Sequence, residues 1–242
     1  MRVYVMTSDR YLHMLRPFGF LFNKYWSADQ EVIVCGFTPP PFSLPPNFRF
    51  MSLGRFEDYP INRWSDALIR LLLLIPDEVF GLMFEDYLIT RPVHMDAIRM
   101  LYDYMVQFKY VLKMDLITDR RFAAGVVPYG HCGYLPLVKS DYNSPYHMSM
   151  MAGLWNRNLM GRFVIPNETP WDLEITGTTR VAAAKDSVIV LGTETWTDNR
   201  YECPLHHTLA HRGGDPGKLL LDELNPADVE EMIQLGYIKS QS

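Results

Sequence analysis

The sequence lacks the cysteine pattern of a disulfide-stapled or zinc-bound protein. Its 3 cysteines, Cys35, Cys132 and Cys203, are far apart and odd in number, so neither a disulfide framework nor a paired zinc motif is expected. Chains of this kind are typical of reducing compartments. The first residues begin a strand pattern at once, without the charged and then apolar segments of a signal peptide. We therefore expect a cytoplasmic protein.

Positive charge and long apolar runs are also scarce. The chain has 23 basic against 28 acidic residues and a net charge of −5, which counts against a broad nucleic-acid surface but leaves room for a local basic groove. The longest apolar run, residues 67–76, contains Arg70 and is too short to cross a bilayer. With 242 residues, 48% of them hydrophobic, the chain can nevertheless bury a sizeable core.

Two groups of catalytic signatures are missing as well. There is no Gly-x-Ser-x-Gly motif and no other serine or cysteine nucleophile signature. No Gly-rich nucleotide fingerprint is present either. Residues 213–218 end like a phosphate loop, but Arg212 replaces its first glycine and Leu219 its final Ser or Thr. Amides of this loop, with Arg212 and Lys218, could meet a diphosphate; the alternative is a surface turn.

Short β-rich segments alternate with helical ones along the chain. Strands are expected over residues 2–6, 31–37, 49–53, 79–90, 110–116, 147–154 and 187–191. Helices are expected over residues 11–25, interrupted by Pro17 and Gly19, and over 67–74, 92–108, 155–163, 170–184 and 225–235, with irregular hairpins or an edge loop over 119–143. This rhythm predicts βαβ units and a mostly parallel central sheet flanked by helices in a single α/β domain.

The apolar run that starts at Val79 ends in two carboxylates, Glu85 and Asp86. Its composition predicts a strand buried on both faces. Because buried ionised carboxylates are costly unless paired, we expect both acids at the carboxyl end of the strand, where open α/β sheets place ligands. Asp86 could hold a divalent cation there. A salt-bridged pair, or a helix cap ahead of Pro92, is the alternative.

Two further polar groups are candidates for a site. Thr7, Ser8 and Asp9 follow the first strand, as expected of a nucleotide-contacting loop or a helix cap. Asp172 and Glu174 follow a predicted N-cap at Thr169 and point in different directions on a helix, so only one of them can be a central general base. Both could instead be acids that the helix dipole favours.

The residues Cys203, His206, His207 and His211 form the one cluster of soft ligands. A structural zinc site would need a further cysteine nearby. One histidine that completes the site at Asp86 is a second interpretation, and solvated or capping histidines are a third.

Taken in order, four of these segments resemble a GT-A type nucleotide-sugar glycosyltransferase of the family-2-like group, in its capsule-type or phage-type members. The resemblance extends to about residue 215. The segments are Thr7-Ser8-Asp9, Asn62-Arg63-Trp64-Ser65-Asp66, Leu82 to Ile89 with its acidic-acidic-Tyr-apolar form, and Ser149 to Trp155 followed by Thr169-Pro170-Trp171-Asp172-Leu173-Glu174.

The resemblance implies one GT-A-like domain, residues 1–242, with a nucleotide-binding half (1–118) and an acceptor-side half (119–242) that carries a closing loop and helix. The donor would be a nucleoside-diphosphate sugar such as a UDP-sugar, its diphosphate bridged by Mn²⁺ or Mg²⁺, and transfer to an acceptor hydroxyl would invert the anomeric carbon. The implied residues are Thr7, Ser8, Asp9, Arg63, Trp64, Asp66, Glu85, Arg212 and Lys218 for the donor, Asp86 and His207 for the metal, and Glu174 or Asp172 for the base.

Three alternatives stay open. Phage-type members can glycosylate hydroxymethylated DNA bases, although the acidic net charge counts against this acceptor. A nucleotidyltransferase would share the α/β nucleotide-binding half and the metal carboxylates, but it would ordinarily have a Gly-rich basic loop where this chain has Thr7-Ser8-Asp9-Arg10. A catalytically inactive glycosyltransferase-like domain could instead only bind a partner.

Overall fold

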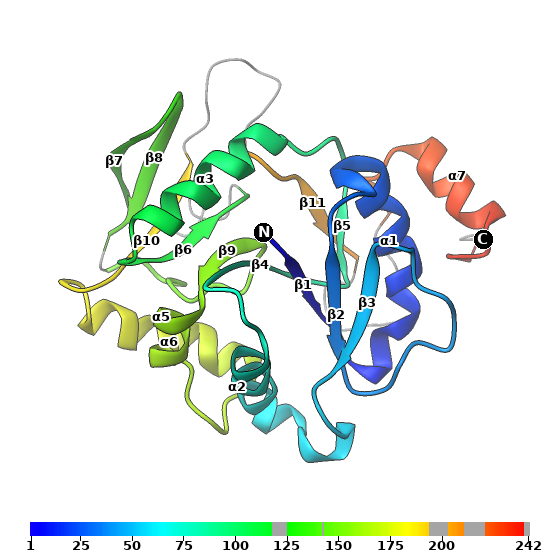
Figure 1. Cartoon of the computed structure of the whole chain (residues 1–242), viewed down its shortest axis with the longest axis horizontal. Helices are drawn as coiled ribbons and strands as arrows, with labels where there is room; N and C mark the ends of the chain where they lie inside the picture. Colours follow the sequence, from blue (N-terminus) through cyan, green and yellow to red (C-terminus); the bar gives the residue numbers. More distant parts are fainter. Residues whose placement is uncertain (118–124, 142, 194–202, 211–220, 240–242) are drawn as a thin grey trace.

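A computed structural model describes residues 1–117, 125–141, 143–193, 203–210 and 221–239. Its centre is a 9-stranded sheet with strand order β3-β2-β1-β4-β9-β6-β10-β8-β7, accompanied by a 2-stranded sheet of β11 and β5 (Figure 1). The strands are β1 Val3–Met6, β2 Val32–Gly36, β3 Phe48–Ser52, β4 Val79–Phe84, β5 Tyr87–Ile89, β6 Val111–Asp115, β7 Val126–Cys132, β8 Leu135–Ser140, β9 Gly153–Asn156, β10 Ile189–Thr193 and β11 His207–Leu209.

The large sheet is mostly parallel. Strand β1 pairs in parallel with β2 and β4, β2 with β3, and β6 with β10. Strand β9 lies antiparallel between β4 and β6, so these two run in the same direction. Among the described strands of this sheet, only β8 and β9 oppose the majority. The predicted fold class is therefore confirmed.

Helices cover both faces of the sheet because successive side chains of a strand point to opposite sides. In β1, Val3 and Val5 join a core with α1, α3 and α7, whereas Tyr4 and Met6 join a core with α2, α5 and α6. Figure 1 shows α2, α5 and α6 on the side of the sheet opposite α3. The helices are α1 Leu15–Phe22, α2 Trp64–Leu74, α3 Met95–Gln107, α5 Arg157–Phe163, α6 Pro170–Ala183 and α7 Pro226–Gln234. None of the helices in the described ranges has the length and apolar character that a bilayer crossing needs.

Pro17 and Gly19 do not interrupt the first helical region, contrary to expectation. The region comprises a 3₁₀ helix (Asp9–Met14), α1 and a π-helical turn (Asn23–Ser27). Pro17 is the third residue of α1, where a missing N–H leaves no intrahelical bond unmade. Gly19 lies against a loop: a Cβ there would stand 3.1 Å from Pro45 Cγ.

The prediction of a strand over residues 147–154 is largely wrong. Strand β9 begins only at Gly153, and the preceding residues are irregular although several are buried. A short apolar run does not distinguish a strand from other buried backbone. Tyr146, immediately before it, has φ of 60°, a left-handed conformation that ends any regular strand pattern. The predicted edge hairpin within 119–143 corresponds to β7 and β8.

Candidate active site at the carboxyl edge of the sheet

The carboxyl ends of β1 and β4 bring two predicted groups together. The pairing of these strands ends with Met6 beside Phe84, so Thr7 and Glu85 leave the sheet side by side. The two acids Glu85 and Asp86 form a turn between β4 and β5. The acids thus lie at the carboxyl end of their strand, where open α/β sheets place ligands.

Glu85 is buried beneath this turn. Desolvation, and next the negative charge of Asp86, raise the pKa of the Glu85 carboxyl well above its usual value. Hydrogen bonds from its own amide, the Thr7 hydroxyl and the Ser8 amide act in the opposite direction without outweighing the burial. Glu85 therefore fastens the segment after β1 to the end of β4, instead of presenting its carboxylate to solvent.

Asp86 is only partly buried, and its backbone is firmly held. Its carbonyl oxygen accepts hydrogen bonds from Ala210 N at 2.8 Å and Leu88 N at 3.2 Å. These bonds tie the turn to β5 and to Ala210, the residue after β11. Strands β5 and β11 themselves pair antiparallel. The backbone that carries the Asp86 carboxylate is therefore held by two hydrogen bonds.

His207 lies on β11, opposite the strand that follows Asp86. Its ring is parallel to that of Tyr87, with centroids 4.6 Å apart and 2° between the planes. Burial lowers the pKa of His207 to about 4, so the imidazole is neutral near pH 7. Both ring nitrogens are buried and have no hydrogen-bond partner among the described residues. A neutral imidazole is the form that binds metal ions.

Helix α6 gives its two acids different surroundings. Asp172 completes a capping box: its Oδ2 accepts from Thr169 Oγ1 at 2.7 Å and Thr169 N at 3.2 Å, while Asp172 N donates to Thr169 Oγ1. The side-chain bond, followed by the backbone bond, lowers the pKa of Asp172. Glu174, partly buried, turns toward the sheet, and its Oε1 accepts from Met150 N at 2.7 Å.

Met150 connects Glu174 with the turn that carries Asp86. Its amide donates to Glu174, and its carbonyl accepts from the Tyr87 hydroxyl at 3.3 Å. Tyr87 follows Asp86 directly in the chain. The expected metal side and the expected acid-base side therefore lie at the same edge of the sheet and are joined through one residue.

The start of α2 borders this edge. Trp64 stacks on Phe84 with centroids 6.0 Å apart. Asp66 pairs with Arg63 at 2.8 Å and accepts from Asn167 N at 2.8 Å. Burial acts to raise the pKa of Asp66, but the bond from Asn167 and the Arg63 guanidinium outweigh it and leave that pKa lowered. Arg63 and Asp66 therefore tie α2 to the segment before α6, whereas Trp64 lies over the end of β4.

Of the remaining residues predicted to contact the donor, one is bonded within the protein and two fall outside the described ranges. The carboxylate of Asp9 is used within the protein, because it accepts from the Thr38 amide at 3.0 Å and the Thr38 hydroxyl at 2.6 Å. Arg212 and Lys218 lie outside the described residues.

Among known proteins, no family model and no curated protein matches this sequence. A solved structure with a similar fold is UTP-bound UGPase from Acinetobacter baumannii, with a TM-score of 0.52 and 11% identity over 99% of this chain and 100% of that one. The chain shares this fold. An apo UDP-glucose pyrophosphorylase has a TM-score of 0.49 and 8% identity, over 97% of this chain and 99% of that one. The galactosyltransferase LgtC, in complex with donor and acceptor sugar analogues, has a TM-score of 0.35 and 12% identity, over 67% of this chain and 60% of that one. At such identities the likeness concerns the fold alone.

Sequence reasoning missed an ion pair in the middle of the sheet. Lys113 and Asp115 on β6 pair with each other, and both side chains are fully buried. Lys113 Nζ also donates to Ser149 O at 2.7 Å, next to Met150. The available signal was two charged residues at alternate positions of an apolar strand, which places both on one face.

The donor set at this edge suits a metal held partly by substrate. Among the residues that the structure describes, no three His, Cys, Asp or Glu side chains come together as a metal-binding group. Mg²⁺ in nucleotide enzymes is usually held by one or two carboxylates and the phosphates of the substrate. Asp86, which is partly exposed, could supply one carboxylate to such a shared site, whereas both ring nitrogens of His207 are buried.

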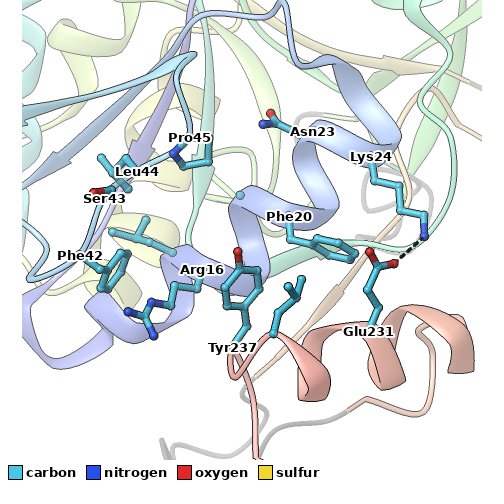
Figure 2. A pocket seen from close by; sticks show the side chains of 13 residues that line it. Arg16, Phe20, Asn23, Lys24, Phe42, Ser43, Leu44, Pro45, Glu231 and Tyr237 are labelled. Atoms are coloured by element: carbon cyan, nitrogen blue, oxygen red, sulfur yellow. Dashed lines mark ion pairs between the residues drawn. The ribbon is translucent and has the colours of Figure 1, made fainter.

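A separate cavity of about 780 Å³ lies between α1, the loop before β3 and α7 (Figure 2). Arg16, Phe42 and Tyr237 gather at one end of it, and Lys24 pairs with Glu231 at 3.7 Å at the other. Its lining residues do not include Asp86, Glu174 or their contacts described above.

Proposed function

We propose that this protein is a nucleotide-sugar-dependent glycosyltransferase whose active site is the sheet edge between Asp86 and Glu174. The observation that carries the proposal is the bridge through Met150, which joins Glu174 to the residue after Asp86. The diphosphate of the donor would lie at Asp86 and the acceptor hydroxyl at Glu174. The shared fold with a UTP-bound enzyme supports nucleotide binding on this architecture.

Glu174 is the better candidate for the general base. Asp172 is fully engaged in capping α6, and the resulting hydrogen bonds make it a weaker base. Glu174 is partly exposed at the edge itself. In the proposed step its carboxylate takes the proton of the acceptor hydroxyl as that oxygen attacks the anomeric carbon. The bond from the anomeric carbon to the diphosphate oxygen breaks, and the configuration inverts.

The residues around Asp86 would hold and orient the donor. Mn²⁺ or Mg²⁺ bound by Asp86, with His207 beside it, would neutralise charge on the departing diphosphate. The segment Thr7–Ser8, held by Glu85, would contact the nucleotide, and Trp64 offers an exposed part of its ring to a base or sugar. Arg212 and Lys218 remain proposed phosphate contacts of the closing loop.

A nucleotidyltransferase is the second candidate, and the fold of the UGPase favours it. In that reaction a sugar-phosphate oxygen attacks the α-phosphorus of a nucleoside triphosphate and pyrophosphate leaves. The segment after β1 counts against it, because Thr7-Ser8-Asp9 continues into a 3₁₀ helix and contains no glycine. The sequence motifs thus favour glycosyl transfer and the fold favours nucleotidyl transfer. The two reactions release different products, nucleoside diphosphate and pyrophosphate, which distinguish them.

The test is a donor panel with product analysis. UDP-, GDP- and TDP-sugars are incubated with and without Mn²⁺, and the same nucleoside triphosphates are incubated with sugar 1-phosphates. The proposal expects nucleoside diphosphate from the first set and no pyrophosphate from the second; the reverse result overturns it. Melting scans accompany the assays, since a ligand at 100 times its Kd adds about 2.7 kcal/mol of stability. No shift with any donor would favour a domain that only binds a partner.

The acceptor is tested in the same assays. Simple glycosides are compared with duplex DNA that contains hydroxymethylated bases. Transfer to DNA, with binding that weakens steeply as salt is added, would identify the phage-type activity. The net charge of −5 leads us to expect transfer to the glycosides.

A further inference from the structure

The irregular segment before β9 is held by side chains from several other elements. Met148 N donates to Thr178 Oγ1 at 3.2 Å, and the Ser149 carbonyl accepts from Lys113. Tyr146, just before them, adopts φ of 60°, a strained conformation for a bulky residue. Such strain persists only where the surroundings fix the backbone, and it is concentrated at functional sites.

Lys113 and Glu174 hold opposite ends of a single peptide group. The Ser149 carbonyl and the Met150 amide belong to one planar unit, so fixing one fixes the other. Lys113 Nζ lies 2.7 Å from Ser149 O, and Glu174 Oε1 lies 2.7 Å from Met150 N. A cation at the carbonyl polarises the group and strengthens its N–H as a donor to the carboxylate. Tyr87 holds the next carbonyl along the chain.

The burial of Lys113 is not explained by stability alone. Its ammonium group pairs with Asp115 and lies 5.1 Å from the centre of the Trp155 ring, and both charged side chains are fully buried. Apolar residues of similar volume often stabilise a core as well as a buried ion pair does. The neighbouring strand leaves space for the lysine at Gly153, where a Cβ would come within 2.8 Å of Lys113 Cε.

We propose that Lys113 is a positioning residue for Glu174. Acting through the 149–150 peptide group, it fixes the direction in which the Glu174 carboxylate meets the acceptor hydroxyl. This inference rests on the glycosyltransferase function proposed above. Lys113 itself touches no reactant. Because Tyr87 holds the adjacent carbonyl, buried contacts also set the position of Glu174 relative to the turn with Asp86.

The test is the double substitution Lys113→Met with Asp115→Leu, which removes both charges and leaves no unpaired buried carboxylate. We expect the folded variant to exchange its Met150 amide hydrogen about tenfold faster than the parent, since a hydrogen bond to a charged group is lost or weakened. With an active donor, kcat should fall while the donor KM is unchanged. Thr178→Ala is the control, because it removes the bond to Met148 N, and a bond within α6 to the Glu174 carbonyl, while the bonds of the 149–150 peptide group to Lys113 and Glu174 remain.

Three results would overturn the proposal. They are unchanged exchange of the Met150 amide in the folded double variant, equal acceleration by Thr178→Ala, and faster exchange with unaltered kcat. If the double variant does not fold, Lys113→Gln with Asp115→Asn is measured in the same way and should give a partial effect. The exchange measurement needs no turnover, so a failure of the glycosyltransferase proposal, seen as an inactive parent protein, remains distinguishable from a failure of this one.

Discussion

The turn after β4 and the N-terminal part of α6 each carry two acids, and in each place their surroundings differ. Glu85 is buried against the segment after β1, and Asp172 is engaged in the cap of its helix. Asp86 and Glu174 are partly exposed at one sheet edge. In both regions one acid stabilises local backbone while its neighbour faces the proposed reaction. Around α6 the difference comes from what each acid bonds: Asp172 accepts from Thr169 at the start of its own helix, whereas Glu174 accepts from Met150 N in another segment.

Replacing Asp86 should have the largest effect on turnover. For Asp86→Ala we expect donor hydrolysis and transfer to fall about a thousandfold, because several kcal/mol of charge stabilisation would be lost. The melting temperature should change little. Asp96→Ala is the matched control, since Asp96 is an exposed acid of α3 that pairs with Arg99 at 3.2 Å. Equal turnover of the Asp86 variant and the parent would refute the assignment.

Glu174→Gln should come next, with kcat about 10² to 10⁴ times lower, as is typical when a general base is removed. The amide oxygen of glutamine can still accept from Met150 N, so the fold and the donor KM should be retained. The steady-state constants are measured beside those of Asp172→Asn. A larger loss of kcat in the Asp172 variant than in the Glu174 variant would identify Asp172, not Glu174, as the general base.

Glu85→Gln should change the pH dependence of stability. Because the folded pKa of Glu85 is raised, the folded state holds this proton more tightly, so its contribution to stability decreases as pH rises from the usual carboxyl range to the raised pKa. The variant should therefore melt higher than the parent at pH 8, by about 3–5 °C for each pKa unit that separates the folded from the unfolded state. At pH 4 the two proteins should melt at similar temperatures. Calorimetry at several pH values measures this difference, which would be absent if Glu85 were exposed.

Asp172→Ala should have the smallest effect. The loss of the reciprocal cap should lower the melting temperature by about 2–4 °C and leave turnover within about twofold. Since the folded pKa of Asp172 is lowered, the stabilisation is present above the usual carboxyl pKa and disappears as pH falls through the folded value. Melting curves at pH 7 and pH 2 test this, and collapse of turnover would contradict the capping role.

Features with local causes could be predicted from the sequence. The cap at Thr169 with Pro170 as first helical residue is confirmed, because the residues that form it are adjacent. The position of Glu85 and Asp86 after a buried strand also followed from the apolar run that ends before them, although Glu85 itself is buried. In contrast, the strand predicted at 147–154 was wrong, because its apolar residues are buried around a backbone that side chains of β6, β5 and α6 hold.

The sequence by itself determined the alternation of strands and helices, the end of β4 and the start of α6. Each depends on neighbouring residues, through apolar periodicity, capping or the cost of desolvating a carboxylate. Only the tertiary structure decided that Asp86 and Glu174 share one edge, that β9 runs against its neighbours, and that β11 pairs with β5. These arrangements depend on contacts between residues far apart in the chain, which no local pattern encodes.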